Sequence, residues 1–162
     1  RSGSWALRCV LETVINTHHH GDHAGVNGVC VDSADIIAHE NARLNMVRGE
    51  QDALPRIVFT DQTAVHLADV EVRAYYLGRG HTTGDSVVYF PDLRTVHGGD
   101  LLHGIAPFID YSNGGSSKAW IGTLEGILAL DFDTAIPGHG PVMTRADVEA
   151  FREQFVAGRT RM

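Results

Sequence analysis

The sequence has few cysteines, few basic residues and no long apolar run, and each of these shortages excludes a class of protein. Cys9 and Cys30 are isolated thiols without C-x-x-C spacing, so we expect neither a zinc ribbon nor a disulfide framework. No apolar run approaches the roughly 20 residues of a membrane-spanning helix, so we expect no membrane partner. The 13 basic residues face 20 acidic ones, and this net charge of −7 argues against nucleic acid as a partner.

The length and composition predict a single domain. Of the 162 residues, 43% are hydrophobic and 20% are charged, which is ordinary for a globular protein. No segment repeats, and none is low in complexity. We therefore expect one domain over residues 1–162, in which residues 1–9 form a linker or the remnant of a lost helix.

The most informative stretch is Thr17–His23, with the sequence THHHGDH. The apolar residues of Val10–Ile15 precede it and predict a buried strand over residues 10–17. Histidines that follow a β-branched run and are interrupted by Gly-Asp do not resemble an affinity tag. A bare surface loop would need no matching histidines elsewhere, and this sequence contains them.

The spacing within this stretch divides the metal-capable side chains into two sets. Alternate residues at the end of a strand point the same way, so His18 and His20 can converge on one ion. Asp22 and His23 then face a neighbouring position. Neutral imidazole and carboxylate are the ligands that zinc prefers outside thiolate sites. His19 is interpreted as a spacer that points away.

Three further elements with metal-capable residues follow along the chain: Gly80–Asp85 (GHTTGD, with His81), Gly98–Asp100 (GGD) and Pro137–Gly140 (PGHG, with His139). The series H-x-H-x-D-H, G-H-T-x-G-D, G-D and P-G-H-G resembles, in this order, the ligand series of the metallo-β-lactamase superfamily. The resemblance extends from about Val14 to the last helix. It implies an α/β fold, the αββα sandwich, in which two sheets lie between outer helices.

The resemblance also implies the ligands of a binuclear metal site. Seven residues carry over from the family's motifs: His18, His20 and His81 for a first metal, Asp22, His23 and His139 for a second, and Asp100 bridging the two. Zinc is the metal that we expect, as two ions, with iron or manganese as alternatives. Because structural zinc is closed by four protein ligands, a site with open positions predicts catalysis.

The chemistry that such a site favours is hydrolysis. Two divalent ions about 3.5–4 Å apart would lower the pKa of a shared water, and the metal-bound hydroxide would attack an ester, thioester, lactone or related bond of a small-molecule substrate. Asp22 is the expected catalytic residue, since it can orient the nucleophile or pass a proton. The alternatives are an iron-dependent oxidoreductase of the same fold, similar to a persulfide dioxygenase, a β-lactamase, or an inactive truncated remnant.

The other polar residues near these motifs carry weaker expectations. His39 and His66 lie in strand-like contexts, which are typical of packing or surface histidines. His97 and His103 flank the third element and are candidates for a hydrogen bond to a ligand or for a contact in the pocket. Asp85 is expected to orient a ligand, as the aspartate after the histidine does in relatives.

The remaining pattern predicts alternating strands and helices. Strands are expected over residues 34–39, 56–60, 63–67, 70–77, 86–90, 95–98 and 135–136. Helices are expected over residues 24–30, 40–48 and 117–130, and from residue 144 onward, where Thr144 and Asp147 resemble a capping box. The loop over residues 101–117 is expected to line a substrate pocket.

The start of the chain differs from the family's pattern. The family normally places several strands before its first histidine motif, where this chain has only seventeen residues. Arg1–Ser4 (RSGS) resembles a cloning linker or a truncation point, so we expect an N-terminally truncated fold. A sheet edge left unpaired would favour a homo-oligomer through that edge. Localisation stays open, with the cytoplasm as the default and a signal peptide upstream as the alternative.

Overall fold

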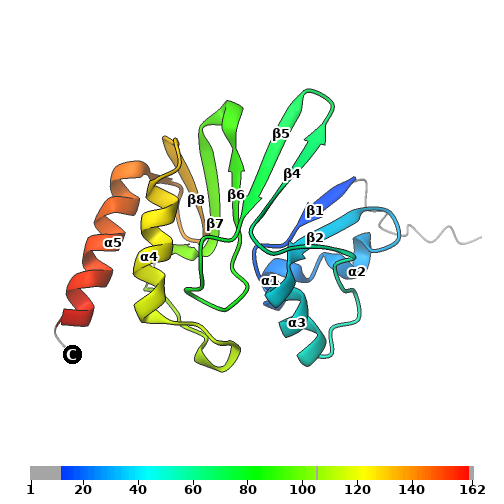
Figure 1. Cartoon of the computed structure of the whole chain (residues 1–162), viewed down its shortest axis with the longest axis horizontal. Coiled ribbons are helices and arrows are strands. Elements are labelled where there is room, and N and C mark those ends of the chain that lie inside the picture. The colour runs from blue at the N-terminus through cyan, green and yellow to red at the C-terminus, as the bar shows by residue number, and fades with distance from the viewer. Residues whose placement is uncertain (1–11, 105, 161–162) are drawn as a thin grey trace, which may run out of the picture.

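A computed structural model of the protein describes residues 12–104 and 106–160. Two β-sheets lie between helices, which is the expected αββα arrangement of an α/β fold (Figure 1). The predicted linker or helix remnant over residues 1–9 lies outside the described residues. Within the described part of the chain, no helix is both long enough and apolar enough to cross a membrane.

The first sheet is small and parallel. Its three strands are, in spatial order, β1 (Thr13–Ile15), β2 (Asp35–His39) and β3 (Ile57–Phe59). The helices on this side of the molecule are α1 (Gly21–Ala24), α2 (Asn27–Cys30) and α3 (Glu40–Arg48). Because parallel strands end at the same edge, the carboxyl ends of β1 and β2 lead into the loop of the first histidine motif and into α3.

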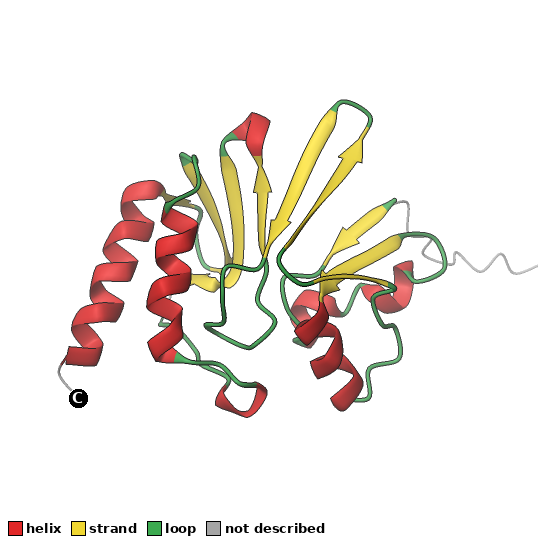
Figure 2. Ribbon diagram, in the orientation of Figure 1, coloured by secondary structure: helices red, strands yellow, loops and turns green. Residues whose placement is uncertain are grey.

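The second sheet has six strands in chain order, with β7 and β8 parallel and the other neighbours antiparallel: β4 (Gln62–Leu67), β5 (Val70–Tyr75), β6 (Val87–Phe90), β7 (Thr95–His103), β8 (Thr134–His139) and β9 (Met143–Thr144). Two long helices, α4 (Ser117–Leu128) and α5 (Arg145–Thr160), lie side by side against its outer face (Figure 2). Short 3₁₀ turns span Pro91–Leu93 and Tyr111–Asn113.

The main hydrophobic core lies between the second sheet and helices α4 and α5. Trp120, Leu124 and Ile127 of α4 are fully buried there, as the apolar stripe of the expected helix predicts. Ser116 caps this helix, because its hydroxyl accepts a hydrogen bond from the Ala119 N–H (3.2 Å). A smaller apolar cluster lies between the two sheets, so most of the burial that stabilises the fold is on the α4–α5 side.

The capping box expected before the last helix is confirmed. The Thr144 N–H donates to the Asp147 carboxylate (2.8 Å), and the Asp147 N–H donates back to the Thr144 hydroxyl (3.3 Å). This reciprocal pair satisfies two N–H groups that would have no partner inside the helix.

The buried face of α3 is only partly apolar. Among its apolar residues, Ala42 and Met46 are buried, but Leu44 and Val47 are 47% and 46% exposed. The helix instead turns Ala42 and Asn45 toward the loop that carries His81, and the backbone of Ala42 approaches Gly84 so closely that a Cβ there would lie 2.3 Å from Ala42 N. Contact with a glycine loop therefore decides which face is buried, not hydropathy alone.

The strand β7 is longer than expected, since it continues through His103 instead of ending at residue 98. Leu101 and Leu102 of this extension are fully buried in the main core. The glycines and the proline nearby predicted a loop over residues 101–117, and the apolar pair overrode that prediction through packing.

The segment after the first histidine motif also differs from the expected structure in two respects. It forms the two short helices α1 and α2 where a single helix over residues 24–30 was expected. Cys30 is 1% exposed and disulfide-bonded, so the expectation of isolated thiols was wrong for this residue. Cys9 lies outside the described residues.

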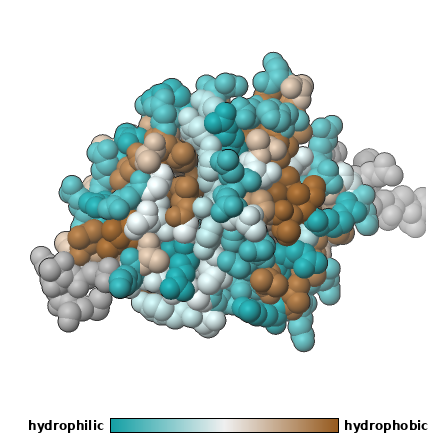
Figure 3. All heavy atoms as spheres, viewed as in Figure 1, coloured by the Kyte–Doolittle hydropathy of each residue, from teal (hydrophilic) through white to brown (hydrophobic). Residues whose placement is uncertain are grey.

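Mostly apolar side chains also line a groove between β1 and the second sheet. Thr13 and Ile15 form one wall, and Val65, Leu67 and Phe90 belong to the other. Among the described strands, β1 pairs with β2 only. On the face seen in Figure 3, apolar side chains reach the surface in separate patches among hydrophilic ones. Association of copies through the edge of β1 stays a prediction.

Candidate metal centre

The loop after β1 delivers the first histidines to the interior. The Asn16 N–H donates to the Ile37 carbonyl of β2 (2.9 Å), and the side chains of Asn16 and Asn27 exchange two hydrogen bonds (3.0 and 2.9 Å). These bonds tie the end of β1 to β2 and to α2. His18 follows directly and is 1% exposed, so the local structure places its ring inside the molecule.

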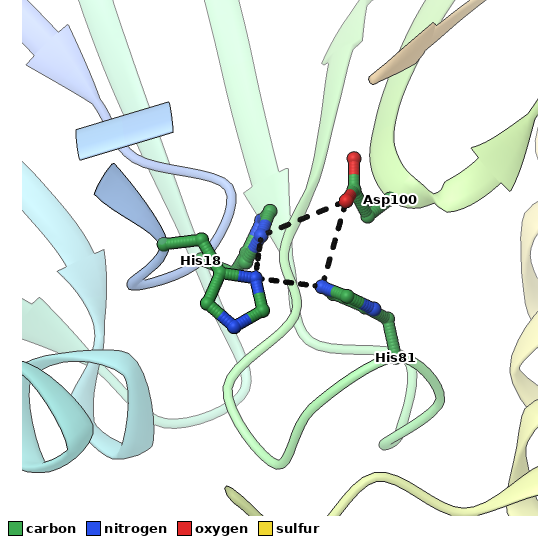
Figure 4. A group of neighbouring side chains, drawn as sticks. His18, His81 and Asp100 are labelled. Atoms are coloured by element: carbon green, nitrogen blue, oxygen red, sulfur yellow. Dashed lines mark hydrogen bonds and ion pairs between the residues drawn. The ribbon is translucent and has the colours of Figure 1, made fainter. Parts of the chain in front are cut away.

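Four side chains form the first donor group: His18, His20, His81 and Asp100. The Nδ1 atom of His20 lies 3.0 Å from both His18 Nε2 and His81 Nε2. The Oδ2 atom of Asp100 lies 3.5 Å from His81 Nε2 and 3.9 Å from His18 Nε2. Figure 4 shows His18, His81 and Asp100 pointing toward one another from three separate segments.

Three side chains form the second donor group: Asp22, His23 and His139. The Oδ2 atom of Asp22 lies 3.1 Å from His139 Nε2 and 3.3 Å from His23 Nε2, and the two Nε2 atoms are 3.3 Å apart. This group is more open than the first, since the side chains of Asp22 and His139 are 58% and 41% exposed. All seven predicted site residues therefore gather in two adjoining groups.

Asp100 lies between these groups. Its Oδ2 faces the first group, and its Oδ1 lies 3.2 Å from His23 Nε2 and 3.6 Å from His139 Nε2. Gly138 makes room for the carboxylate, because a Cβ at this position would lie 2.0 Å from Asp100 Oδ1. The glycine that precedes His139 thus has a packing reason, which the motif alone did not reveal.

Burial and neighbouring charges set the protonation of the first group. Burial, together with the adjacent imidazoles, lowers the pKa of His18 well below its usual value, and burial lowers the pKa of His81. Burial opposes ionisation of Asp100, but the surrounding histidines outweigh it and lower the pKa of the carboxyl. Neutral imidazoles beside an ionised carboxylate are the forms that bind metals.

The second group differs electrostatically. Burial disfavours the charged form of His23, but contact with the Asp100 carboxylate and the charge of Asp22 outweigh it and raise the pKa of His23. A metal ion at this position would have to displace the proton that the two carboxylates favour, so binding there is more sensitive to acid.

The donor set fits a bound metal ion. Asp100 Oδ1 is buried and has no hydrogen-bond partner of acceptable geometry among the described residues. In the first group, nitrogens of His18, His20 and His81 turn toward one another in the interior. Buried lone pairs that converge without enough donors are costly, and a cation shared among them would satisfy them.

The loop that follows β7 was expected only to line a substrate pocket. It also contacts two of these histidines through the ring nitrogens that face away from the donor group. The His81 Nδ1–H donates to the Phe108 carbonyl (2.8 Å), and the His20 Nε2 lies 3.0 Å from Asp110 Oδ2. Asp110 was not predicted as a functional residue. The available signal was weak: one aspartate before a Ser-Asn-Gly-Gly turn, in the loop that leaves Asp100.

Asp85 holds the loop around His81 without touching the donor atoms. It accepts hydrogen bonds from the Thr82 N–H (2.8 Å), the Thr82 hydroxyl (2.6 Å) and the Gly80 N–H (3.1 Å). Burial raises its pKa to about 7, against the effect of these donors. Asp85 thus orients a candidate ligand through the backbone of the loop.

The remaining histidines separate into packed, exposed and unpartnered residues. His39 is buried and its ring stacks on Tyr76 at 3.9 Å between centroids, while His66 is exposed. His19 belongs to neither donor group, but its ring is buried. It is 6% exposed, and its Nε2 lies 4.0 Å from Asp110 Oδ2.

The two histidines that flank Asp100 have different surroundings. The His97 Nδ1 accepts a hydrogen bond from the Gly99 N–H (3.1 Å), which gives this residue a structural role in the bulge of β7. His103 is 5% exposed, and its Nε2 lies 3.6 Å from Asp100 Oδ2. Neither ring nitrogen of His103 has a hydrogen-bond partner among the described residues.

Fold and site together define a class, and comparison with known proteins agrees: the chain belongs to the metallo-beta-lactamase superfamily, whose family model matches residues 10–139. Among curated relatives, the chain is 30% identical over 149 residues to the 2,4-dinitroanisole O-demethylase subunit alpha of Nocardioides sp. (strain JS1661), covering 86% of this chain and 44% of the relative. It is also 30% identical to the metallo-beta-lactamase type 2 of Bacteroides fragilis, covering 83% of this chain and 55% of the relative.

Other relatives match a similar share of the chain. The hydroxyacylglutathione hydrolase of Synechocystis sp. (strain ATCC 27184 / PCC 6803 / Kazusa) is 31% identical over 116 residues, which are 70% of this chain and 41% of the relative. The chain thus spans about half the length of the curated relatives that it matches. These relatives are mostly hydrolases by name. The family and the grouped side chains support a metal cofactor.

A solved structure confirms the fold. The metallo-beta-lactamase from Pontibacter korlensis superposes with a TM-score of 0.79 at 19% identity, over 90% of this chain and 69% of that one. At this identity the likeness establishes the fold alone.

Proposed function

We propose that this protein is a binuclear metal-dependent hydrolase that binds two zinc ions and cleaves an ester, thioester, lactone or related bond in a small-molecule substrate. The observation that carries the proposal is the position of Asp100 between two donor groups, with one carboxylate oxygen toward each. A structural zinc site would need only one closed group of four ligands. Two adjoining groups, one of them partly open, fit two ions that take part in catalysis.

The candidate ligands divide between the two ions as follows: His18, His20 and His81 for the first, Asp22, His23 and His139 for the second, and Asp100 for both. Bound divalent ions supply Lewis acidity and lower the pKa of a coordinated water. The protein's contribution is to hold the first group away from bulk water. Charge interactions in such a buried group are stronger than at the surface.

Asp22 is the residue that we propose for proton transfer. Its Oδ2 lies beside both imidazoles of the second group, and its side chain is 58% exposed. A carboxylate in this position can hold a proton and exchange it with solvent, whereas Asp100 is buried between the groups. Asp22 therefore combines a ligating and a catalytic role, whereas Asp100 only ligates.

The surroundings suit a small organic substrate. A polar cavity of about 340 Å³, lined in part by Asp22, His23 and His139, adjoins the second group. On the other side, Phe108 and Tyr111 are 61% and 66% exposed, and the Phe108 ring lies 5.8 Å from the His81 ring. Polar groups beside exposed aromatic rings are typical of sites that bind small organic molecules. The relatives' names cover a lactamase, a hydroxyacylglutathione hydrolase and an O-demethylase, so the proposal keeps the bond class broad.

The test is to load the protein with zinc, measure the metal content by elemental analysis, and assay thioesters, lactones, β-lactams and phosphodiesters. We expect two zinc ions per chain and hydrolysis that a chelator abolishes and zinc restores. The variant His66→Ala, which changes an exposed histidine away from both groups, is the matched control. Protein that binds no metal would overturn the proposal, as would iron with oxygen consumption and no hydrolysis.

A further inference from the structure

One loop supplies outer partners to two of the three histidines in the first donor group. This loop runs from residue 106 to residue 116, between β7 and α4. The carbonyl of Phe108 accepts from the His81 Nδ1–H, and the carboxylate of Asp110 lies 3.0 Å from His20 Nε2. The two contacts use the ring nitrogens that face away from the donor group.

The chemistry of the second contact fixes the state of His20. A carboxylate can only accept a hydrogen bond, so the hydrogen lies on His20 Nε2. In the neutral ring, Nδ1 then carries the lone pair, and Nδ1 is the atom 3.0 Å from His18 Nε2 and His81 Nε2. The contact with Asp110 thus decides which nitrogen of His20 is available as a ligand.

Asp110 is itself held firmly. Its Oδ1 accepts hydrogen bonds from the Ser112 hydroxyl and from the Asn113 N–H (3.1 Å), and its Oδ2 accepts from the Asn113 side chain (2.6 Å). Its own N–H donates to the His81 carbonyl (2.9 Å), so the loop is tied to the segment that carries His81. Asp110 is 7% exposed, and this burial strengthens the hydrogen bond between its carboxylate and His20.

We propose that Asp110 is a positioning residue, which holds His20 as its Nε2–H tautomer and directs Nδ1 toward the first metal ion. This inference rests on the proposed metal site and adds a residue that lies outside the seven ligands. Loss of such an outer carboxylate typically weakens metal affinity about 10- to 100-fold. We expect that range for Asp110→Ala.

The same residues allow a different interpretation, in which His19, His20 and Asp110 bind a separate cation. The geometry favours the positioning role. His20 Nε2 already lies at hydrogen-bonding distance from Asp110, and a nitrogen that carries this hydrogen cannot bind a metal. His19 Nε2 is farther from the carboxylate, at 4.0 Å.

The experiment compares Asp110→Ala, Asp110→Asn and Ser112→Ala in the zinc-loaded protein. Ser112→Ala is the matched control, because it removes a hydrogen bond to the same carboxylate without touching His20. Zinc affinity is measured by competition with a chelator, folding by thermal unfolding, and the His20 tautomer by long-range ¹H–¹⁵N NMR. The NMR measurement is repeated on metal-free protein, so failure of metal binding and failure of this inference are separate results.

We expect Asp110→Ala to weaken zinc binding by about 10- to 100-fold and to lose the Nε2–H signal of His20. Asp110→Asn, whose amide oxygen can still accept the hydrogen bond, should recover part of the affinity, and Ser112→Ala should retain the signal. An unchanged affinity and tautomer in Asp110→Ala would overturn the inference. So would the loss of one bound ion in both His19→Ala and Asp110→Ala, since that result would make Asp110 a ligand of a separate cation.

Discussion

The two donor groups that meet at Asp100 differ in burial and in support. In the first group, His18 and His81 are 1% and 0% exposed, and the loop over residues 106–116 bonds the outer nitrogens of His20 and His81. In the second group, the side chains of Asp22 and His139 are 58% and 41% exposed. One group is preformed by packing and hydrogen bonds, and the other lines a polar cavity.

This difference assigns separate tasks to the two groups. Ligands that are already oriented lose little conformational entropy when they bind an ion, so the first group should bind its ion more tightly. An open group loses more entropy and admits water and substrate more easily. We therefore expect the first ion to act chiefly as a fixed electrostatic anchor, while exchange with solvent takes place at the second.

Removing one candidate ligand of each group in turn tests this difference, and it should have the largest effect on activity and metal content. His81→Ala should lower kcat/KM about a thousandfold or more, because a lost Lewis acid is worth several kcal/mol and each 1.36 kcal/mol is a factor of ten. His139→Ala should release only the more weakly bound ion. Elemental analysis and steady-state kinetics measure both outcomes.

The expected difference in affinity would be wrong if His139→Ala released the more tightly bound ion and His81→Ala released the more weakly bound one. Stepwise removal by a chelator provides the control in the unmodified protein. We expect two phases, of which the faster one is absent in His139→Ala. A single phase in which both ions leave together would mean that the groups bind cooperatively and that their difference in burial has no consequence for affinity.

Four of the seven candidate ligands are local in the sequence, and the other three, His81, Asp100 and His139, were assigned by the resemblance to the family's motifs. His18, His20, Asp22 and His23 lie within six positions at the end of a strand, and the geometry of a strand end decides which way they face. Asp110 could not be found in this way. Its partner His20 lies 90 positions away, and the contact depends on the path of a loop.

The fold shows the same limit. The existence of most strands followed from the pattern, and the outer helices followed from the resemblance, but the exposure of part of α3 did not. Leu44 and Val47 are exposed because the backbone of this helix packs against Gly84. A close approach between two distant backbones leaves no periodic trace in either segment.

A smaller effect is expected from Asp22→Asn, which removes the proton-handling carboxylate and weakens one candidate ligand of the second ion, with little change in packing. General acid–base residues typically contribute about a hundredfold or more to the rate, so turnover should fall by about that factor. The free energy of unfolding should change by less than about 0.5 kcal/mol, since the side chain is largely exposed. Turnover and urea unfolding measured on the same preparation separate the two quantities. A variant that kept its turnover would exclude Asp22 as the catalytic residue.

The smallest effect concerns His39, a histidine outside both groups. Its Nδ1 accepts from the Asn41 N–H (3.2 Å) at the start of α3, and its Nε2–H donates to the Thr60 carbonyl (2.9 Å), so the neutral ring is the one that fits. Burial lowers the pKa of His39, although the Thr60 carbonyl, Glu40 and Asp61 act in the opposite direction. The unfolded chain then binds the proton more tightly. The stability that His39 contributes is therefore complete above its ordinary pKa of 6.5 and decreases as the pH falls below that value.

His39→Asn tests this expectation, because asparagine can also cap a helix but does not titrate. The other buried histidines add to the acid sensitivity of the protein, so the informative quantity is the difference between the two proteins and not the slope of either one. Between about pH 7 and pH 5, the free energy of unfolding should fall more steeply in the unmodified protein, by no more than the linkage of one proton. Urea unfolding across that range measures the difference. Equal slopes would mean that His39 is as easily protonated in the folded chain as in the unfolded one, and the acid sensitivity would then belong to the donor groups alone.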